Sequence, residues 1–140
     1  MFSAAHAALL FSVLSLATTA YFFMGGLPLL ILRHDVPMDA RFVASFFRLY
    51  YRLALFSSSG LTASHVLAGQ RLLAVGAAGL VLATLVVRGM LVPAMRLYGE
   101  GIQRQDEGAL RRFRHLHSTV LTIILVEVAL IIASLTQLKF

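Results

Sequence analysis

One acidic residue, Glu127, lies in the middle of a long apolar stretch near the C-terminal end of the sequence. A carboxyl group in such surroundings is neutral, or it pairs with a cation or a hydroxyl group. Glu127 can therefore relay protons, bind a cation, pair with Arg52 or Arg88, or join helices through a structural hydrogen bond. The hydroxyl groups expected near the same depth belong to Thr18, Thr19, Ser57, Ser58, Ser59 and Thr84. The sequence leaves the functional and the structural roles open.

Histidines are the second group of residues that could do chemistry. His6 and His65 stand in two successive apolar segments. If these segments are neighbouring helices, both rings lie at a similar depth and can bind haem b, copper or zinc between them. Alternatively, they are two interfacial histidines that never meet. Of His115 and His117, one is expected to face the other helices, because residues two positions apart on a helix point in different directions.

Arginines form the third group. Arg41, Ser45, Arg48 and Arg52 recur at helical spacing on one face of a segment. With Arg88 and Arg96 they can form a basic pocket for an anionic group, or they can extend separately to the lipid headgroups. The residues expected to contact anionic lipid are Arg41, Arg48, Arg96, Arg111, Arg112 and Arg114.

The composition indicates where these side chains must be placed. Of the 140 residues, 59% are hydrophobic and 13% are charged, and the mean hydropathy is +0.86. Soluble domains carry about 25% charged residues, so an ordinary soluble enzyme is excluded. The chain has no cysteine, which excludes disulfide scaffolds and thiolate sites. We find no phosphate loop, HExxH motif or triad pattern, so we expect a non-enzymatic protein.

Four stretches of the sequence are long and apolar enough to suggest helices that cross a membrane. We place them at about 4–32, 42–67, 72–95 and 118–138, with Tyr98–Arg114 as a loop and the helical start of the last span. Gly79 and Ala83 form a small-xxx-small pair, which allows another helix to approach closely. The predicted fold is therefore an all-α integral membrane four-helix bundle, with residues 1–140 forming a single domain.

The basic residues are distributed unevenly between the two ends of this expected bundle. Nine arginines flank the first and third connections, whereas the other side has only Arg71 and Lys139. The positive-inside rule places the arginine-rich connections in the cytoplasm and both termini on the non-cytoplasmic side of the inner (plasma) membrane. The net charge of +6 thus predicts contact with the lipid bilayer and its anionic headgroups, and not with nucleic acid. A larger membrane complex or a homo-oligomer is a further expected partner.

Several short motifs in this layout resemble a known family. They are His6, Gly25-Gly26, Pro28, the run from Phe46 to Arg52, Leu91-Val92-Pro93, and the run from Arg112 to His117. Over nearly its whole length the chain resembles the CopD-like group of small four-helix membrane domains. It is similar to a branch described as a domain of unknown function, in which Phe-x-x-Leu-His precedes the last span, as Phe113, Leu116 and His117 do here.

The CopD-like group also includes the membrane protoporphyrinogen oxidases, which use haem. Their resemblance implies a haem-binding role for His6 and, for the wider group, haem b or copper as a cofactor. The lysine expected in the third span is missing, since Arg88 is the basic residue there, so we do not carry this activity over.

Three functions follow as hypotheses. The first is a non-enzymatic accessory subunit or a binding or transport module. The second is a membrane redox protein that holds haem b or copper through His6 and His65, with His117 as a further cofactor-binding candidate. The third is a proton- or ion-handling module centred on Glu127, with Arg52 or Arg88 as a buried partner charge.

Overall fold

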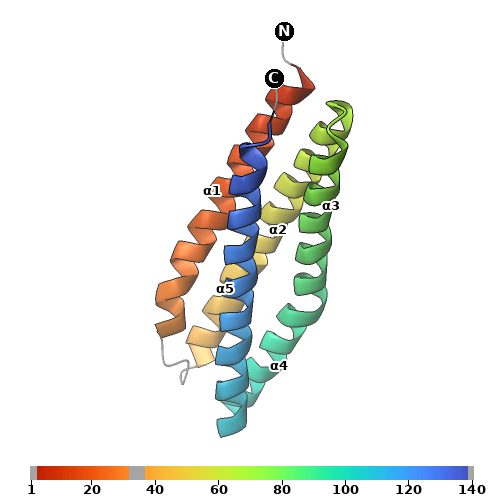
Figure 1. The fold of residues 1–140 in the computed structure, drawn as a ribbon. Helices are drawn as coiled ribbons and strands as arrows, with labels where there is room; N and C mark the ends of the chain where they lie inside the picture. Colours follow the sequence, from red (N-terminus) through yellow and green to blue (C-terminus); the bar gives the residue numbers. More distant parts are fainter. Residues whose placement is uncertain (1–2, 32–36, 139–140) are drawn as a thin grey trace.

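The chain folds into four helical rods that pack side by side with alternating direction (Figure 1). This computed structural model describes residues 3–31 and 37–138. In chain order, the helices are α1 (Ala4–Ile31), α2 (Pro37–Leu67), α3 (Arg71–Val86), η1 (Val87–Leu91), α4 (Val92–Gln103) and α5 (Glu107–Leu135). The beginning of α1 and the end of α5 lie at the end of the bundle where α2 turns into α3, at the top of Figure 1. The predicted all-α bundle is confirmed.

The third rod continues through α3, η1 and α4 as one helix with a short π-helical segment in the middle. Pro93 follows this segment directly. Proline lacks an N–H group, and its ring collides with the carbonyl group four residues earlier. A wider helical turn accommodates that collision. The helix therefore continues past residue 95, where we expected the third span to end, because α4 extends the rod to Gln103.

The polar segment 98–114 is mostly helical and not a loop. Helix α4 ends at Gln103 and α5 already begins at Glu107. Asp106 caps α5, since its carboxylate accepts a hydrogen bond from the backbone N–H of Gly108 at 3.0 Å. Most of the charged side chains that suggested a loop lie on exposed helical surface, and such a surface resembles a loop in composition.

Three of the rods are long and apolar enough to cross a membrane. They are Ala4–Ile31, Arg71–Ile102 and Glu107–Leu135. Helix α2 has 31 residues but does not reach this level of hydropathy, because Arg41, Arg48 and Arg52 interrupt its first half. It packs against α1, α3 and α4. The protein is thus a helical membrane protein whose second helix is the least apolar one.

A tight turn joins α2 to α3, as the sequence predicted. Gly69 adopts a φ of +71°, which a glycine tolerates without steric cost. The turn makes α2 and α3 antiparallel neighbours. At the opposite end, Arg33 of the first connection lies outside the described residues, as does Lys139, which the charge count also used.

Glycines show which helices approach most closely. A Cβ atom on Gly26 of α1 would overlap the Leu121 side chain of α5, so this glycine allows α1 and α5 to pack. At Gly79 of α3, no atom of the described chain lies within 4 Å of the position that a Cβ would occupy. The small-xxx-small pair at Gly79 and Ala83 is therefore not a close contact within this chain, and that face of α3 is open.

Candidate functional site

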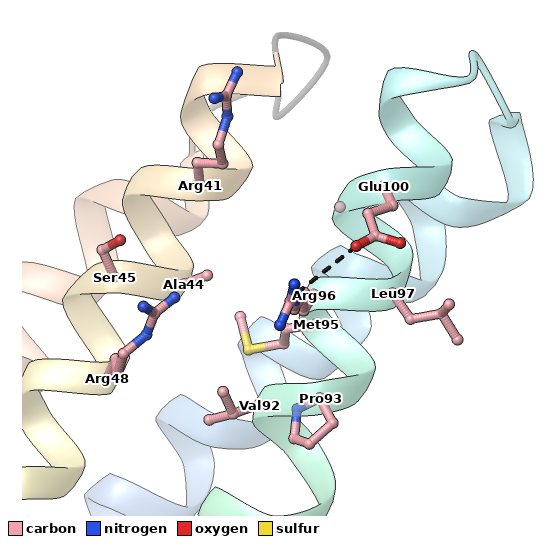
Figure 2. Close-up of a pocket in the computed structure, with 11 residues that line it drawn as sticks. Arg41, Ala44, Ser45, Arg48, Val92, Pro93, Met95, Arg96, Leu97 and Glu100 are labelled. Atoms are coloured by element: carbon pink, nitrogen blue, oxygen red, sulfur yellow. Dashed lines mark ion pairs between the residues drawn. The ribbon is translucent and has the colours of Figure 1, made fainter.

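An open cleft between α2 and α4 gathers three of the arginines that the sequence analysis identified. Arg41, Ser45 and Arg48 line it from α2, and Arg96 and Glu100 line it from α4 (Figure 2). Its volume is about 790 Å³, within the range of roughly 300–1,000 Å³ that small-molecule sites occupy. Of the six residues expected to form a basic pocket, the four that line this cleft are Arg41, Ser45, Arg48 and Arg96.

The lining of this cleft combines positive charge with apolar surface. The apolar part consists of Ala44, Val92, Pro93, Met95 and Leu97. The charged side chains of the described lining are three arginines and one carboxylate, Glu100. Glu100 contacts Arg96, with 3.7 Å between Glu100 Oε1 and Arg96 Nε. Both side chains of this pair are exposed, so the attraction is weak. The surplus of positive charge favours an anion, and guanidinium groups suit phosphate and carboxylate in particular.

Arg52 and Arg88 lie outside the cleft and are both exposed on the surface of the bundle. The prediction that they are buried charges beside Glu127 is therefore wrong. The reason is helical phase. Arg52 comes two residues after the buried Tyr50, and two residues turn the helix by about 200°. Arg88 is likewise turned outward from its buried neighbour Val87.

The remaining predicted lipid-binding arginines, Arg111, Arg112 and Arg114, are exposed on the first turns of α5. The guanidinium carbon of Arg112 lies 5.8 Å from the centre of the Tyr98 ring, in a cation–π arrangement. The start of α5, which carries these arginines, lies beside the end of α4, which contributes Arg96 and Glu100 to the cleft (Figure 1). Their contact with lipid stays a prediction.

A polar cluster lies in the centre of the bundle and surrounds Glu127. The Glu127 side chain is buried, and it accepts a hydrogen bond from the hydroxyl group of Tyr50, which is also buried. Of the hydroxyl groups expected nearby, four line a small cavity together with Glu127, namely Thr19, Ser57, Ser58 and Thr84. Thr18 is half-buried and Ser59 is exposed, and neither lines the cavity.

Tyr50, the partner of Glu127, was not among the residues predicted from the sequence. A signal was available, because Tyr50, Ala54, Ser57 and Leu61 recur at helical spacing and are all buried. This spacing identifies the inner face of α2 and places a phenol hydroxyl on it. The arginines on the opposite face of the same helix concealed the pattern.

His6 and His65 lie at the same level of the bundle, as expected, but their environments differ. Phe11 of α1 contacts Gly60 of α2. His6 precedes Phe11 by five residues and His65 follows Gly60 by five residues, so on antiparallel helices the two histidines lie equally far from this contact and on the same side of it. His6 is exposed, and its Nδ1 atom lies 2.6 Å from the Ser3 hydroxyl oxygen. His65 is 1% exposed, and its Nδ1 atom lies 2.9 Å from Oε1 of Gln70.

The two histidines do not fit a haem held between them inside the bundle. The Nε2 atom of His65 is buried and has no hydrogen-bond partner in the described chain, so this nitrogen has room for a ligand only in the cavity beside it. The cavity beside it has a volume of only about 110 Å³, which is space for a few water molecules and not for a porphyrin. It is lined from α2, α3 and α5, whereas His6 belongs to α1. The described residues also contain no cluster of three or more His, Cys, Asp or Glu residues that could hold a metal ion.

His117 is the histidine that faces the other helices, and His115 is exposed, which confirms the expected division between them. The His117 ring is fully buried and packs edge-on against Phe47, with 5.2 Å between the ring centroids. Phe47 and His65 are eighteen residues apart on α2, or about 27 Å along the helix. His117 and His65 therefore cannot bind the same ligand.

No family model, no curated protein and no solved structure matches this chain. The resemblance to the CopD-like group therefore stays a prediction from short motifs.

Proposed function

We propose that this protein is a non-enzymatic binding module of the membrane that holds an anionic amphiphile in the cleft between α2 and α4. One observation carries the proposal. Arg41, Arg48 and Arg96 come from two helices and line the same cavity of about 790 Å³. The occupant we favour is a lipid with a phosphate headgroup, because the arginines suit the headgroup and the apolar wall suits the start of an acyl chain.

The depth of the arginines supports a headgroup as the ligand. Arg41 and Arg48 are seven residues apart on α2, which corresponds to about 10 Å along the helix axis. This separation exceeds the thickness of one interfacial layer, about 5–8 Å, but both long side chains can extend toward the same layer of headgroups. Arg96 lines the cleft from the other side. A phosphate between these groups would contact guanidinium groups from both helices.

The distribution of charge supports an orientation for this site. The arginines of the cleft and of the start of α5 belong to the beginning of α2, to α4 and to the beginning of α5, and these three segments meet at one end of the bundle (Figure 1). We propose that this end faces the cytoplasm of the inner (plasma) membrane, with both termini on the other side. The cleft would then meet the leaflet in which anionic lipids attract basic segments.

The test is lipid retention by the purified protein. The protein is extracted in mild detergent, supplied with equal amounts of phosphatidylglycerol and phosphatidylcholine, and studied by native mass spectrometry. We expect selective retention of phosphatidylglycerol. Arg48→Gln and Arg96→Gln should each weaken it about fivefold, since one arginine near a lipid surface contributes about 1 kcal/mol.

Arg71→Gln is the matched control, because Arg71 is an exposed arginine at the opposite end of the bundle. It should leave retention unchanged. Equal retention of both lipids, or equal losses in all three variants, would contradict a cleft-specific site and favour arginines that extend separately into the headgroups. Displacement of the lipid by millimolar inorganic phosphate would show that the site recognises the phosphate group without the acyl chains.

A further inference from the structure

A second polar feature, independent of the cleft, is a small buried cavity in the middle of the bundle. All four rods contribute to its wall through polar side chains, which are Ser15, Thr19, Ser57, Ser58, Thr84 and Glu127. Its volume is about 10 Å³, which is close to the space that one water molecule or one small ion requires. Six oxygen-bearing side chains around so small a space point to an enclosed occupant.

Three of the hydroxyl groups of this wall donate their hydrogen atoms away from the cavity, to the backbone of their own helices. Thr19, Ser58 and Thr84 donate their hydroxyl hydrogens to backbone carbonyl oxygens one turn earlier, at 2.6, 2.5 and 2.8 Å. Each of these hydroxyl oxygens keeps its lone pairs as acceptors. The Tyr50 hydroxyl is already donated to Glu127. The cavity is therefore surrounded mainly by acceptors, and such a set favours a cation.

Ser15 supplies an independent indication of an occupant. Its side chain is 3% exposed, and its Oγ atom is buried with no hydrogen-bond partner in the described chain. A buried hydroxyl group that lacks a partner costs about 1–3 kcal/mol, so polar groups in protein interiors nearly always have one. An ion or molecule in the cavity would satisfy this atom.

The charge of Glu127 has no compensating basic side chain. Among the described residues, the salt bridge with a nitrogen–oxygen distance below 4 Å joins Arg96 to Glu100 and does not involve Glu127. Arg52 and Arg88 are exposed on the outside of the bundle. A buried carboxylate must be paired with a cation or become neutral by taking up a proton. A cation in the adjoining cavity would provide the pairing.

We propose that this cavity is a binding site for one monovalent cation of the size of Na⁺, held by the Glu127 carboxylate and the hydroxyl oxygens of Ser15 and Thr84 with their neighbours. Oxygen ligands suit hard cations of this kind. A single carboxylate balances a single positive charge, whereas divalent sites in proteins usually combine several carboxylates. When the cation is absent, a proton on Glu127 takes its place.

The experiment measures how Na⁺ protects Glu127 from a chemical reagent. Dicyclohexylcarbodiimide modifies protonated carboxyl groups in apolar surroundings, and mass spectrometry of the purified full chain identifies the modified residue. A cation bound to the carboxylate prevents the reaction. In choline chloride buffer of constant ionic strength, NaCl at ten times its dissociation constant should slow the modification about tenfold. KCl at the same concentration should slow it much less, because the cavity is too small.

Two variants separate the proposal from a merely structural polar cluster. Thr84→Val removes one ligand oxygen and should raise the half-protecting Na⁺ concentration about tenfold, as expected for the loss of one interaction with a charged partner. Thr119→Val is the matched control, because Thr119 also donates to the carbonyl group one turn earlier and lines none of the cavities to which Glu127 contributes. It should not change the protection.

Equal modification rates in Na⁺, K⁺ and choline would overturn the proposal and indicate that the cavity holds only water. The same conclusion follows if Thr84→Val and Thr119→Val are protected alike. If the reagent leaves Glu127 unmodified in every buffer, isothermal titration of NaCl into the protein decides the question. Heat of binding that is lost in Ser15→Ala supports the site, and the absence of any heat specific to Na⁺ refutes it.

Discussion

The hydrogen bond between Tyr50 and Glu127 can be tested by removing only its donor. Tyr50→Phe keeps the buried ring, whose centroid lies 5.3 Å from that of Phe22 and 5.4 Å from that of Tyr51. A hydrogen bond to a charged group contributes about 1.5–3 kcal/mol in soluble proteins. Between membrane helices the average is about 0.6 kcal/mol and the maximum about 1.7 kcal/mol. We expect Tyr50→Phe to lower the free energy of unfolding by about 1–2 kcal/mol.

Tyr51→Phe is the matched control for this experiment. Tyr51 is the next residue on the same helix and is 2% exposed, but its hydroxyl group is buried with no hydrogen-bond partner in the described chain. Removing that hydroxyl should leave stability unchanged or raise it by up to about 1 kcal/mol. Both variants are unfolded reversibly by titrating SDS into dodecyl maltoside micelles, with helix content followed by circular dichroism.

A double-mutant cycle then assigns the effect to the pair. In a Glu127→Leu background, Tyr50→Phe should cost close to nothing, because the acceptor is already gone, and the difference between the two backgrounds is the coupling energy. The reasoning is refuted if Tyr50→Phe and Tyr51→Phe have the same effect. It is also refuted if the cost of Tyr50→Phe persists in the Glu127→Leu background.

Two further predictions concern the fold. Gly60→Ala should destabilise the protein by about 1–3 kcal/mol, because the new Cβ atom would overlap the Phe11 ring. Gly79→Ala should stabilise it by up to about 1 kcal/mol, because the space there is open. Unfolding in SDS measures both changes, and equal effects would contradict the packing of α1 against α2. Asp106→Ala should cost about 1 kcal/mol through loss of the cap on Gly108. Hydrogen exchange should then accelerate in the first turn of α5 and not elsewhere, and an unchanged rate there would show that the cap contributes nothing.

The fold class could be predicted because it depends on a property of whole segments. Long apolar stretches with few charges favour membrane helices whatever their neighbours are. The short turn at Gly69 followed from the same reasoning, since little chain separates two such stretches. The continuation of the third rod past Pro93 could not be predicted, because it depends on a π-helical turn that accommodates the proline.

The candidate sites were harder to predict, because they depend on how each helix is rotated about its own axis. Glu127 was identified correctly as an enclosed carboxyl group, since it is the one acid in its apolar stretch. Arg52 was assigned to the interior although it is exposed, and Tyr50 was overlooked although it is buried. These two residues are only two positions apart, and polar side chains stand on both faces of α2. The hydrophobic pattern of α2 therefore did not indicate which face of this helix is directed toward the core.

The composition of α2 also explains why this helix alone lacks the hydropathy of a typical span. Its inner face contributes Tyr50, Ser57 and Ser58 to the centre of the bundle, and another face contributes Arg41 and Arg48 to the cleft. Neither set of side chains would be stable in contact with lipid hydrocarbon. The contacts of α2 with α1, α3 and α4 shield the inner set, and in the proposed orientation the headgroup region would solvate the arginines. A helix with two polar faces is therefore compatible with the membrane only as part of this bundle, so α2 by itself should fail to insert, whereas α5 by itself should insert.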